Sequence, residues 1–142
     1  MYKVLIANGS KKRETRLIAD CIAEGLRKSG IYINVLDIKD ITRLNEYDAI
    51  ILDSGIYIKE LLQKIKPALS DTNEFNFQKK IGGVFGGPTC SENKIGNLFH
   101  TMKNSLKMDM VNDPLIIDSI SDSSEGREAK QYGQQIAEKL IN

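Results

Sequence analysis

The chain has 142 residues, in which 20 Lys and Arg nearly balance 19 Asp and Glu, and it contains one His, two Cys and no Trp. This balance excludes a coat of positive charge for nucleic acid, and the apolar runs are far shorter than the ~18 residues of a membrane span. One His and the wide spacing of Cys21 and Cys90 argue against a Ser-His-Asp hydrolase and a zinc site. We expect one domain over residues 1–142, in a reducing cytoplasm, with no signal peptide.

The first predicted strand and helix enclose a polar turn. Val4–Ala7 is a continuous apolar run, which is typical of a strand buried on both faces of a parallel sheet. Apolar side chains then follow with helical spacing, at Leu17, Ile18, Cys21, Ile22 and Leu26. The turn between them reads NGSKKRET. At the start of a helix, its backbone amides and hydroxyl groups predict an anion site.

The middle of the chain predicts two strands and one helix. A strand at 31–37 is followed by a polar linker at 40–48 and a buried strand at 49–52, which ends at Asp53. The turn DSGIY leads into a helix, in which Pro67 predicts a kink or an early end. The apolar side of this helix consists of Leu61, Leu62, Ile65, Ala68 and Leu69, and the next loop carries Phe75 and Phe77, which we expect to pack back onto the body.

The rest of the chain predicts two strands and two helices. Residues 81–85 predict the fourth strand, where Gly82 and Gly83 indicate close approach of another segment. Thr89 and Glu92 then predict a capping box. The helix that follows has apolar positions Ile95, Leu98, Phe99, Met102 and Leu106. A short fifth strand at 115–117 precedes a last helix, which begins at 122–125 and has apolar positions Ala129, Tyr132, Ile136, Ala137 and Leu140.

A strand followed by a helix, repeated five times, predicts an α/β fold. Its three layers contain a doubly wound parallel sheet of five strands with helices on both faces. Ligands of such sheets bind beyond the carboxyl ends of the strands. Polar turns follow the first, third and fourth predicted strands, so we expect these three turns to form one site at that edge.

The first turn, taken alone, suits a terminal phosphate group. Gly9 permits a tight bend, Ser10 and Thr15 offer hydroxyl groups, and the residues at 11–13 (KKR) add positive charge. The turn lacks the Gly-Lys-Ser/Thr ending of a Walker loop and the G-x-G-x-x-G pattern of dinucleotide sites. The alternative is a solvated basic turn whose Ser caps the helix.

Residues 10–15 (SKKRET) resemble the phosphate loop of flavodoxins, Ser/Thr-x-Thr/Ser-Gly-x-Thr, in length and at both ends. Residues 44–57 are similar to flavodoxin-like domains of the protoporphyrinogen-oxidase type, and residues 84–87 (VFGG) are similar to flavodoxin domains fused to diiron proteins. The resemblance extends over essentially the whole chain, through the closing helix. It implies a short-chain flavodoxin with strand order 2-1-3-4-5 and FMN as its cofactor. The residues at 12–14 (KRE) depart from the family pattern.

The resemblance assigns FMN-binding roles to all three turns. In the second turn, Tyr57 is the candidate for stacking on the isoalloxazine ring; the alternative is a tyrosine packed at the start of the second helix. In the third turn, backbone amides and a small hydroxyl group face the pyrimidine edge, and Cys90 is interpreted as an incidental thiol. No catalytic or metal-binding residue is expected. The expected cofactor-binding residues are Ser10, Lys11, Lys12, Arg13, Glu14, Thr15, Ser54, Gly55, Ile56, Tyr57, Gly86, Gly87, Pro88, Thr89 and Cys90.

The resemblance implies an electron carrier that shuttles electrons between redox-partner proteins through FMN. One alternative is an FMN-dependent oxidoreductase acting on a quinone, a porphyrinogen or NAD(P)H, which residues 54–57 suggest. Another is a flavodoxin-fold binding or regulatory domain without FMN, which Arg13 and Glu14 suggest. We expect no nucleic-acid partner, no membrane span, and a monomer or weak homodimer. Flavodoxins are strongly acidic and this chain is near neutral, so we expect a milder separation of its two one-electron potentials.

Overall fold

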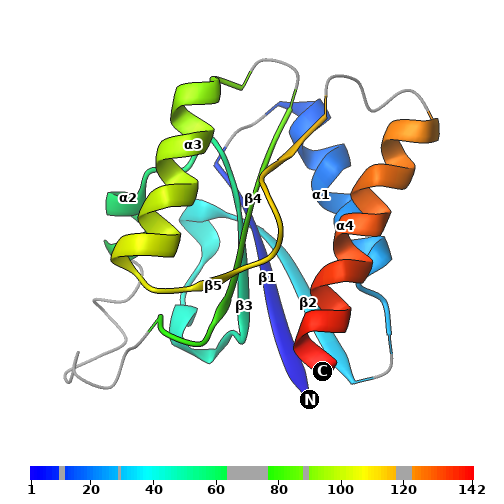
Figure 1. Cartoon of the computed structure of the whole chain (residues 1–142), viewed down its shortest axis with the longest axis horizontal. Coiled ribbons are helices and arrows are strands. Elements are labelled where there is room, and N and C mark those ends of the chain that lie inside the picture. The colour runs from blue at the N-terminus through cyan, green and yellow to red at the C-terminus, as the bar shows by residue number, and fades with distance from the viewer. Residues whose placement is uncertain (10–11, 29, 64–76, 88–89, 118–122) are drawn as a thin grey trace.

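A parallel sheet with helices on both faces forms the body of the molecule in the computed structural model, which describes residues 1–9, 12–28, 30–63, 77–87, 90–117 and 123–142 (Figure 1). The strands follow the order β2-β1-β3-β4-β5, and β6 also pairs with β4. The predicted order 2-1-3-4-5 is confirmed. The strands are β1 (Tyr2–Asn8), β2 (Ile31–Asp37), β3 (Ala49–Asp53), β4 (Ile81–Gly86), β5 (Asp109–Met110) and β6 (Leu115–Ile116).

The helices lie in two layers. Helices α1 (Arg13–Gly25) and α4 (Ser123–Ile141) cover one face of the sheet, and α2 (Ile58–Gln63) and α3 (Glu92–His100) cover the other (Figure 1). Helix α3 continues through a π-helical turn at Thr101–Ser105. The predicted three-layer α/β architecture is therefore confirmed.

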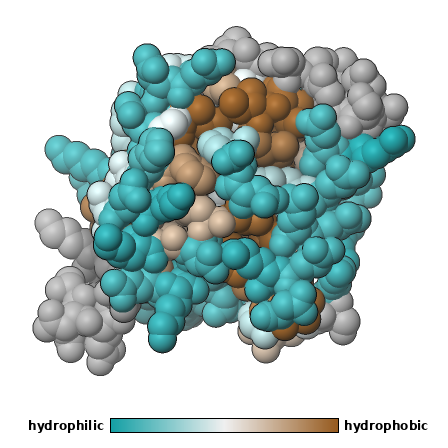
Figure 2. Space-filling model, in the orientation of Figure 1, coloured by the Kyte–Doolittle hydropathy of each residue, from teal (hydrophilic) through white to brown (hydrophobic). Residues whose placement is uncertain are grey.

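The predicted fifth strand, at 115–117, is only partly right. Two short strands, β5 and β6, pair in parallel with the two ends of β4. Asn112 lies between them with a φ of +46°, a left-handed conformation that Asn adopts more readily than most residues. This bend interrupts the edge strand, and the sequence pattern identified only its second half. Figure 2 shows apolar surface on the face that lies between α3 and α4 in Figure 1. In β6, Ile116 is 44% exposed.

The expected fivefold repeat of strand and helix is wrong at one connection. Between β2 and β3 the chain forms two 3₁₀ turns, at Ile38–Asp40 and Leu44–Glu46, rather than an α-helix. Ile41, Leu44 and Tyr47 are buried there. Ile41 and Tyr47 each directly follow one of the two turns, and Leu44 begins the second turn.

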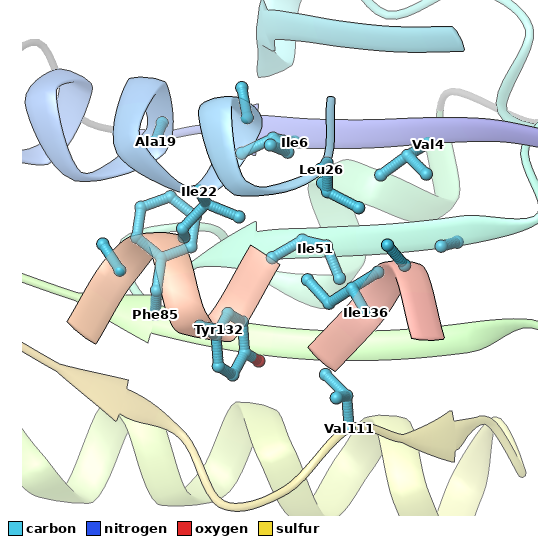
Figure 3. Packing of buried hydrophobic residues seen from close by; sticks show 14 of the residues in the cluster. Val4, Ile6, Ala19, Ile22, Leu26, Ile51, Phe85, Val111, Tyr132 and Ile136 are labelled. Carbon is cyan, nitrogen blue, oxygen red and sulfur yellow. The ribbon is translucent and has the colours of Figure 1, made fainter. Parts of the chain in front are cut away.

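Two apolar cores, one on each face of the sheet, hold the layers together. Along β1, Val4 and Ile6 point to the α1–α4 side, and Leu5 and Ala7 point to the α2–α3 side. Such a strand needs apolar residues at every position, which explains the unbroken run in the sequence. Figure 3 shows the first core, in which Phe85 lies among residues of α1 and α4.

Most predicted apolar helix positions are buried, but some are not. Leu17 in α1 is 37% exposed and Leu62 in α2 is 40% exposed, so the prediction that they face the core is wrong. The buried stripe of α1 runs through Thr15, Ile18 and Ile22 instead. Phe77 is buried as predicted, whereas Ile65, Pro67, Ala68, Leu69 and Phe75 lie outside the described residues.

Glycines allow three close approaches of backbone in the body. A Cβ atom at Gly83 would lie 2.4 Å from the hydroxyl oxygen of Tyr132, which confirms the predicted close packing on β4. A Cβ atom at Gly25 would lie 2.0 Å from the carbonyl oxygen of Lys130, and one at Gly133 would lie 2.1 Å from that of Ile22. Helices α1 and α4 therefore pack backbone against backbone.

Candidate functional site

The turns after β1, β3 and β4 enclose a cavity of about 310 Å³. This confirms that the three polar turns meet at the carboxyl edge of the sheet. The residues that line the cavity come from all three turns and from the starts of α1 and α3. They are Lys12, Thr15, Asp53, Ser54, Gly55, Gly87, Cys90, Ser91 and Lys94.

The carboxylate of Asp53 joins the first two turns. Asp53 is only 3% exposed. Its Oδ2 atom accepts a hydrogen bond of 3.1 Å from the backbone N–H of Gly9, and its Oδ1 atom accepts one of 3.1 Å from that of Gly55. Hydrogen bonds of this kind fix the two backbone donors in place around one carboxylate. Asp53 thus sets the spacing of the first two turns.

The first turn also packs directly on the second. A Cβ atom at Gly9 would lie 2.5 Å from the Cγ1 atom of Ile56, so any larger residue there would push the turns apart. Ser54 in the second turn donates its backbone N–H to the carbonyl oxygen of Phe85, at 2.8 Å. This bond ties the second turn to the end of β4.

Two helices begin at the cavity. Lys12 is the N-terminal cap of α1, and its side chain makes no capping hydrogen bond to the helix. In α3 the cap is Ser91, whose Oγ atom accepts a hydrogen bond of 3.4 Å from the backbone N–H of Lys94. The predicted capping box of Thr89 and Glu92 is therefore wrong, because the helix begins two residues later than the box requires. Helix N-termini attract anions through their unpaired amides.

Thr15 and Ser54 are the two buried hydroxyl residues among the described residues of the cavity, and Thr15 is the one that α1 contributes. It is 4% exposed, although it lies in the first turn of α1. A Cβ atom at Gly87 would lie 3.5 Å from the Thr15 Oγ1 atom, so the hydroxyl group faces the third turn at van der Waals distance. A hydroxyl group here, in a cavity that Lys12 also lines, suits a phosphate oxygen.

A second cavity, of about 250 Å³, adjoins the first and shares Ser54 and Lys94 with it. Its other lining residues are more apolar: Ile56, Tyr57, Ile58, Asn97, Leu98 and Thr101. The two cavities differ in character. The first offers cations and hydroxyl groups, and the second offers an aromatic ring and aliphatic side chains.

Tyr57 lies at the surface of this second cavity. It is 57% exposed, so the alternative of a packed tyrosine is wrong. Its backbone N–H donates to the Glu60 Oε1 atom at 3.3 Å, which is half of a capping box at the start of α2. The Lys94 Nζ atom lies 4.6 Å from the centre of its ring.

Most of the described residues expected at the site line one of the two cavities: Lys12, Thr15, Ser54, Gly55, Ile56, Tyr57, Gly87 and Cys90. Arg13 and Glu14 are exposed in the first turn of α1 and line neither cavity. Gly86 is buried beneath Cys90, whose Sγ atom would lie 2.8 Å from a Cβ at that position. Ser10, Lys11, Pro88 and Thr89 lie outside the described residues.

Three lining residues of the first cavity were not expected from the sequence: Asp53, Ser91 and Lys94. The second cavity adds Ile58, Asn97, Leu98 and Thr101, which were not expected either. Asp53 directly follows β3, so the rule that strand ends meet at one edge identifies it in retrospect. Ser91 and Lys94 have the spacing of a helix cap and its amide partner. The sequence carries no signal that the Lys94 side chain would reach the second turn.

The part of the chain that the structure describes offers few other candidate binding sites. No group of three or more His, Cys, Asp or Glu residues there is arranged to hold a metal ion. None of the described helices combines the length and the apolar character needed to cross a membrane. A hollow of about 590 Å³ along α4 contains Asp113 and Glu128 but no Lys or Arg among its described lining residues, which makes it a poor anion site.

Known proteins resemble this chain in part of its sequence and in its fold. No family model matches the chain. A flavodoxin of Clostridium saccharobutylicum is 30% identical over 86 residues, and this match spans 58% of the chain and 54% of that protein, so it covers about half the length of its relative.

Solved structures extend the likeness to nearly the full length of the chain. A flavodoxin from the domain Archaea has a TM-score of 0.75 at 20% identity, with 99% of both chains covered. The oxidised Flavodoxin 1 of Bacillus cereus has a TM-score of 0.71 at 21% identity, with 96% of this chain and 97% of that chain covered. At these identities the structures establish the flavodoxin fold. The sequence match to a flavodoxin over 86 residues agrees with this fold.

Proposed function

We propose that this protein binds FMN across the two joined cavities and carries electrons between redox-partner proteins. The observation that carries the proposal is the pairing of unlike cavities. A polar cavity with the Lys12 ammonium and the Thr15 hydroxyl adjoins one bordered by Tyr57. A ligand that fits both has an anionic end and a planar, largely apolar end. FMN has this shape, and it is the cofactor that flavodoxins typically bind.

The described residues fit such a ligand in charge as well as in shape. Lys12 and Thr15, beside the start of α1, would hold the phosphate. Tyr57 and Ile56 would lie against the ring, and Ser54 and Gly55 would offer hydrogen bonds between the two ends. When bound, FMN supplies the redox chemistry, and the protein sets the relative stability of its oxidised and reduced states.

A carrier is favoured over an enzyme by what the cavities contain. In the part of the chain that the structure describes, the lining residues include neither a His nor a pair of nearby carboxylates that would act as general acid and base. An electron carrier needs no such groups, because the flavin exchanges electrons directly with its partners.

Titration of the purified protein with FMN tests the proposal, with riboflavin as the matched ligand that lacks the phosphate. We expect the visible spectrum of FMN to shift and its fluorescence to change at micromolar protein, with weaker binding of riboflavin. If FMN at these concentrations leaves both signals unchanged, the proposal is wrong. Turnover of NAD(P)H or a quinone by the FMN-loaded protein would instead favour the oxidoreductase.

A further inference from the structure

Lys94 stands where the two cavities meet. It is the only Lys or Arg among the described residues that lines both of them. Its ammonium group lies over the Tyr57 ring at 4.6 Å from the centroid, and none of the salt bridges between described residues includes it. An exposed cation–π contact is weak, so this ammonium has no strong competitor for an anionic ligand.

The other charges of the first cavity leave this position cationic. Lys12 lies at the start of α1, and Asp53 carries the one carboxylate among the described lining residues. Both Asp53 oxygens already accept backbone N–H groups, from Gly9 and Gly55. Of the two lysines that line the first cavity, Lys94 is the one that also lines the second, beside Tyr57.

We infer that Lys94 selects the reduced form of the bound flavin. The inference rests on the proposed function. Full reduction by two electrons, with uptake of one proton, gives the isoalloxazine ring a negative charge that the oxidised ring lacks. A ring that occupies the second cavity lies within reach of the Lys94 ammonium, whose positive charge favours the reduced anion over the oxidised neutral ring. The phosphate carries the same charge in both forms, so contacts to the phosphate do not discriminate between them.

This selection is a thermodynamic link between charge and redox state. If the ammonium lowers the dissociation constant of reduced FMN more than that of oxidised FMN, the midpoint potential of the bound flavin rises by the corresponding amount. Removal of the charge must therefore change the ratio of the two dissociation constants and not merely their common value.

The test compares Lys94→Gln, Lys94→Arg and a control, Lys103→Gln, with the natural protein. Lys103 is exposed in the turn that follows α3 and lines neither cavity. Dissociation constants are measured anaerobically for oxidised FMN and for FMN reduced with excess dithionite. We expect Lys94→Gln to weaken binding of reduced FMN about fivefold relative to oxidised FMN, from one partly screened charge at this range. The two-electron midpoint potential should fall by about 20 mV.

The control variants decide the interpretation. Lys94→Arg keeps the charge and should restore most of the difference, and Lys103→Gln should leave the ratio unchanged. Equal weakening of both forms by Lys94→Gln, or no change in either, would overturn the inference while the proposed function stands. If the natural protein binds FMN in neither state, both the proposed function and the inference fail, so the two failures are distinguishable.

Discussion

The Asp53 carboxylate accepts the backbone N–H of Gly9 at 3.1 Å, across a sequence separation of 44 residues. Gly55 donates to the other oxygen of the same carboxylate. One buried side chain thus fixes two of the three turns of the candidate site in place. The turns are preorganised before any ligand arrives, which lowers the entropic cost of binding.

Replacement of Asp53 should therefore affect both stability and binding. In Asp53→Ala two backbone N–H groups lose their acceptor, and we expect the free energy of unfolding to fall by about 1–3 kcal/mol. Urea denaturation measures this change, and FMN affinity should fall with it. Asp48→Ala is the matched control, because exposed Asp48 accepts a backbone N–H from Lys3 at the other end of the sheet. A loss in the control as large as in Asp53→Ala would show that burial of the carboxylate is not the cause.

The hydroxyl group of Thr15 should matter for the phosphate end of the ligand alone. Thr15→Val keeps the shape of the buried side chain and removes the hydrogen bond. We expect the dissociation constant for FMN to rise about tenfold or more, which is typical of a lost hydrogen bond to a charged group. Binding of riboflavin, which has no phosphate, should be unchanged. A matching loss for riboflavin would place the phosphate elsewhere.

Two Gly→Ala substitutions, one at the contact between α1 and α4 and one within α3, should have opposite effects on stability. Gly133→Ala would put a methyl group 2.1 Å from the carbonyl oxygen of Ile22, and we expect a loss of about 3 kcal/mol or more in the free energy of unfolding. Gly96 lies within α3, and a Cβ atom there would meet nothing within 4 Å. Gly96→Ala should therefore stabilise the protein by about 0.5–1 kcal/mol. Thermal or urea unfolding distinguishes the two.

The two cysteines should differ in their protection by ligand. Cys90 lines the first cavity, so bound FMN should slow its alkylation by iodoacetamide. Cys21 packs against the α1–α4 core, on the other face of the sheet, and should be indifferent to FMN. Mass spectrometry of peptides after timed labelling measures both rates. Protection of Cys21, or none of Cys90, would contradict the position of the site.

Burial also raises the pKa of the Cys21 thiol above its ordinary value of 9.0, and the Lys130 ammonium opposes this only in part. Because the thiolate is the reactive form, Cys21 should react more slowly at pH 8 than in the unfolded chain. Its rate should continue to rise above pH 9, where that of an unfolded chain levels off. Because the pKa of Cys21 is higher in the folded state than in the unfolded chain, the folded state binds this proton more tightly. The free energy of unfolding therefore falls as the pH rises above 9.

The elements that the sequence predicted best are those buried on both sides. Strands β1, β3 and β4 have apolar runs that serve two cores at once. By contrast, β5 has only two residues, Asp109 and Met110, too few for any pattern. Leu17 was wrongly assigned to the core because neighbouring apolar residues in a helix point in different directions. The width of the buried stripe depends on what packs against it.

The position of the site could be predicted from topology, but its internal contacts could not. Strand ends in a parallel sheet meet at one edge, and this rule alone brought Thr15, Ser54 and Gly87 together. The hydrogen bonds of Asp53 and the contact of Lys94 with Tyr57 depend on distances between turns. Those distances are set by side-chain packing, such as Ile56 on Gly9, that no local pattern records.

The close packing of Gly25 in α1 against Lys130 in α4 has a consequence for how the protein matures. Helix α1 carries Thr15 at its first turn, yet the surface that docks it includes residues more than a hundred positions later in the chain. During synthesis, α1 and Thr15 can therefore pack stably only after α4 has left the ribosome. We expect a nascent chain released before residue 123 to lack a competent ligand site, although all three turns are already present.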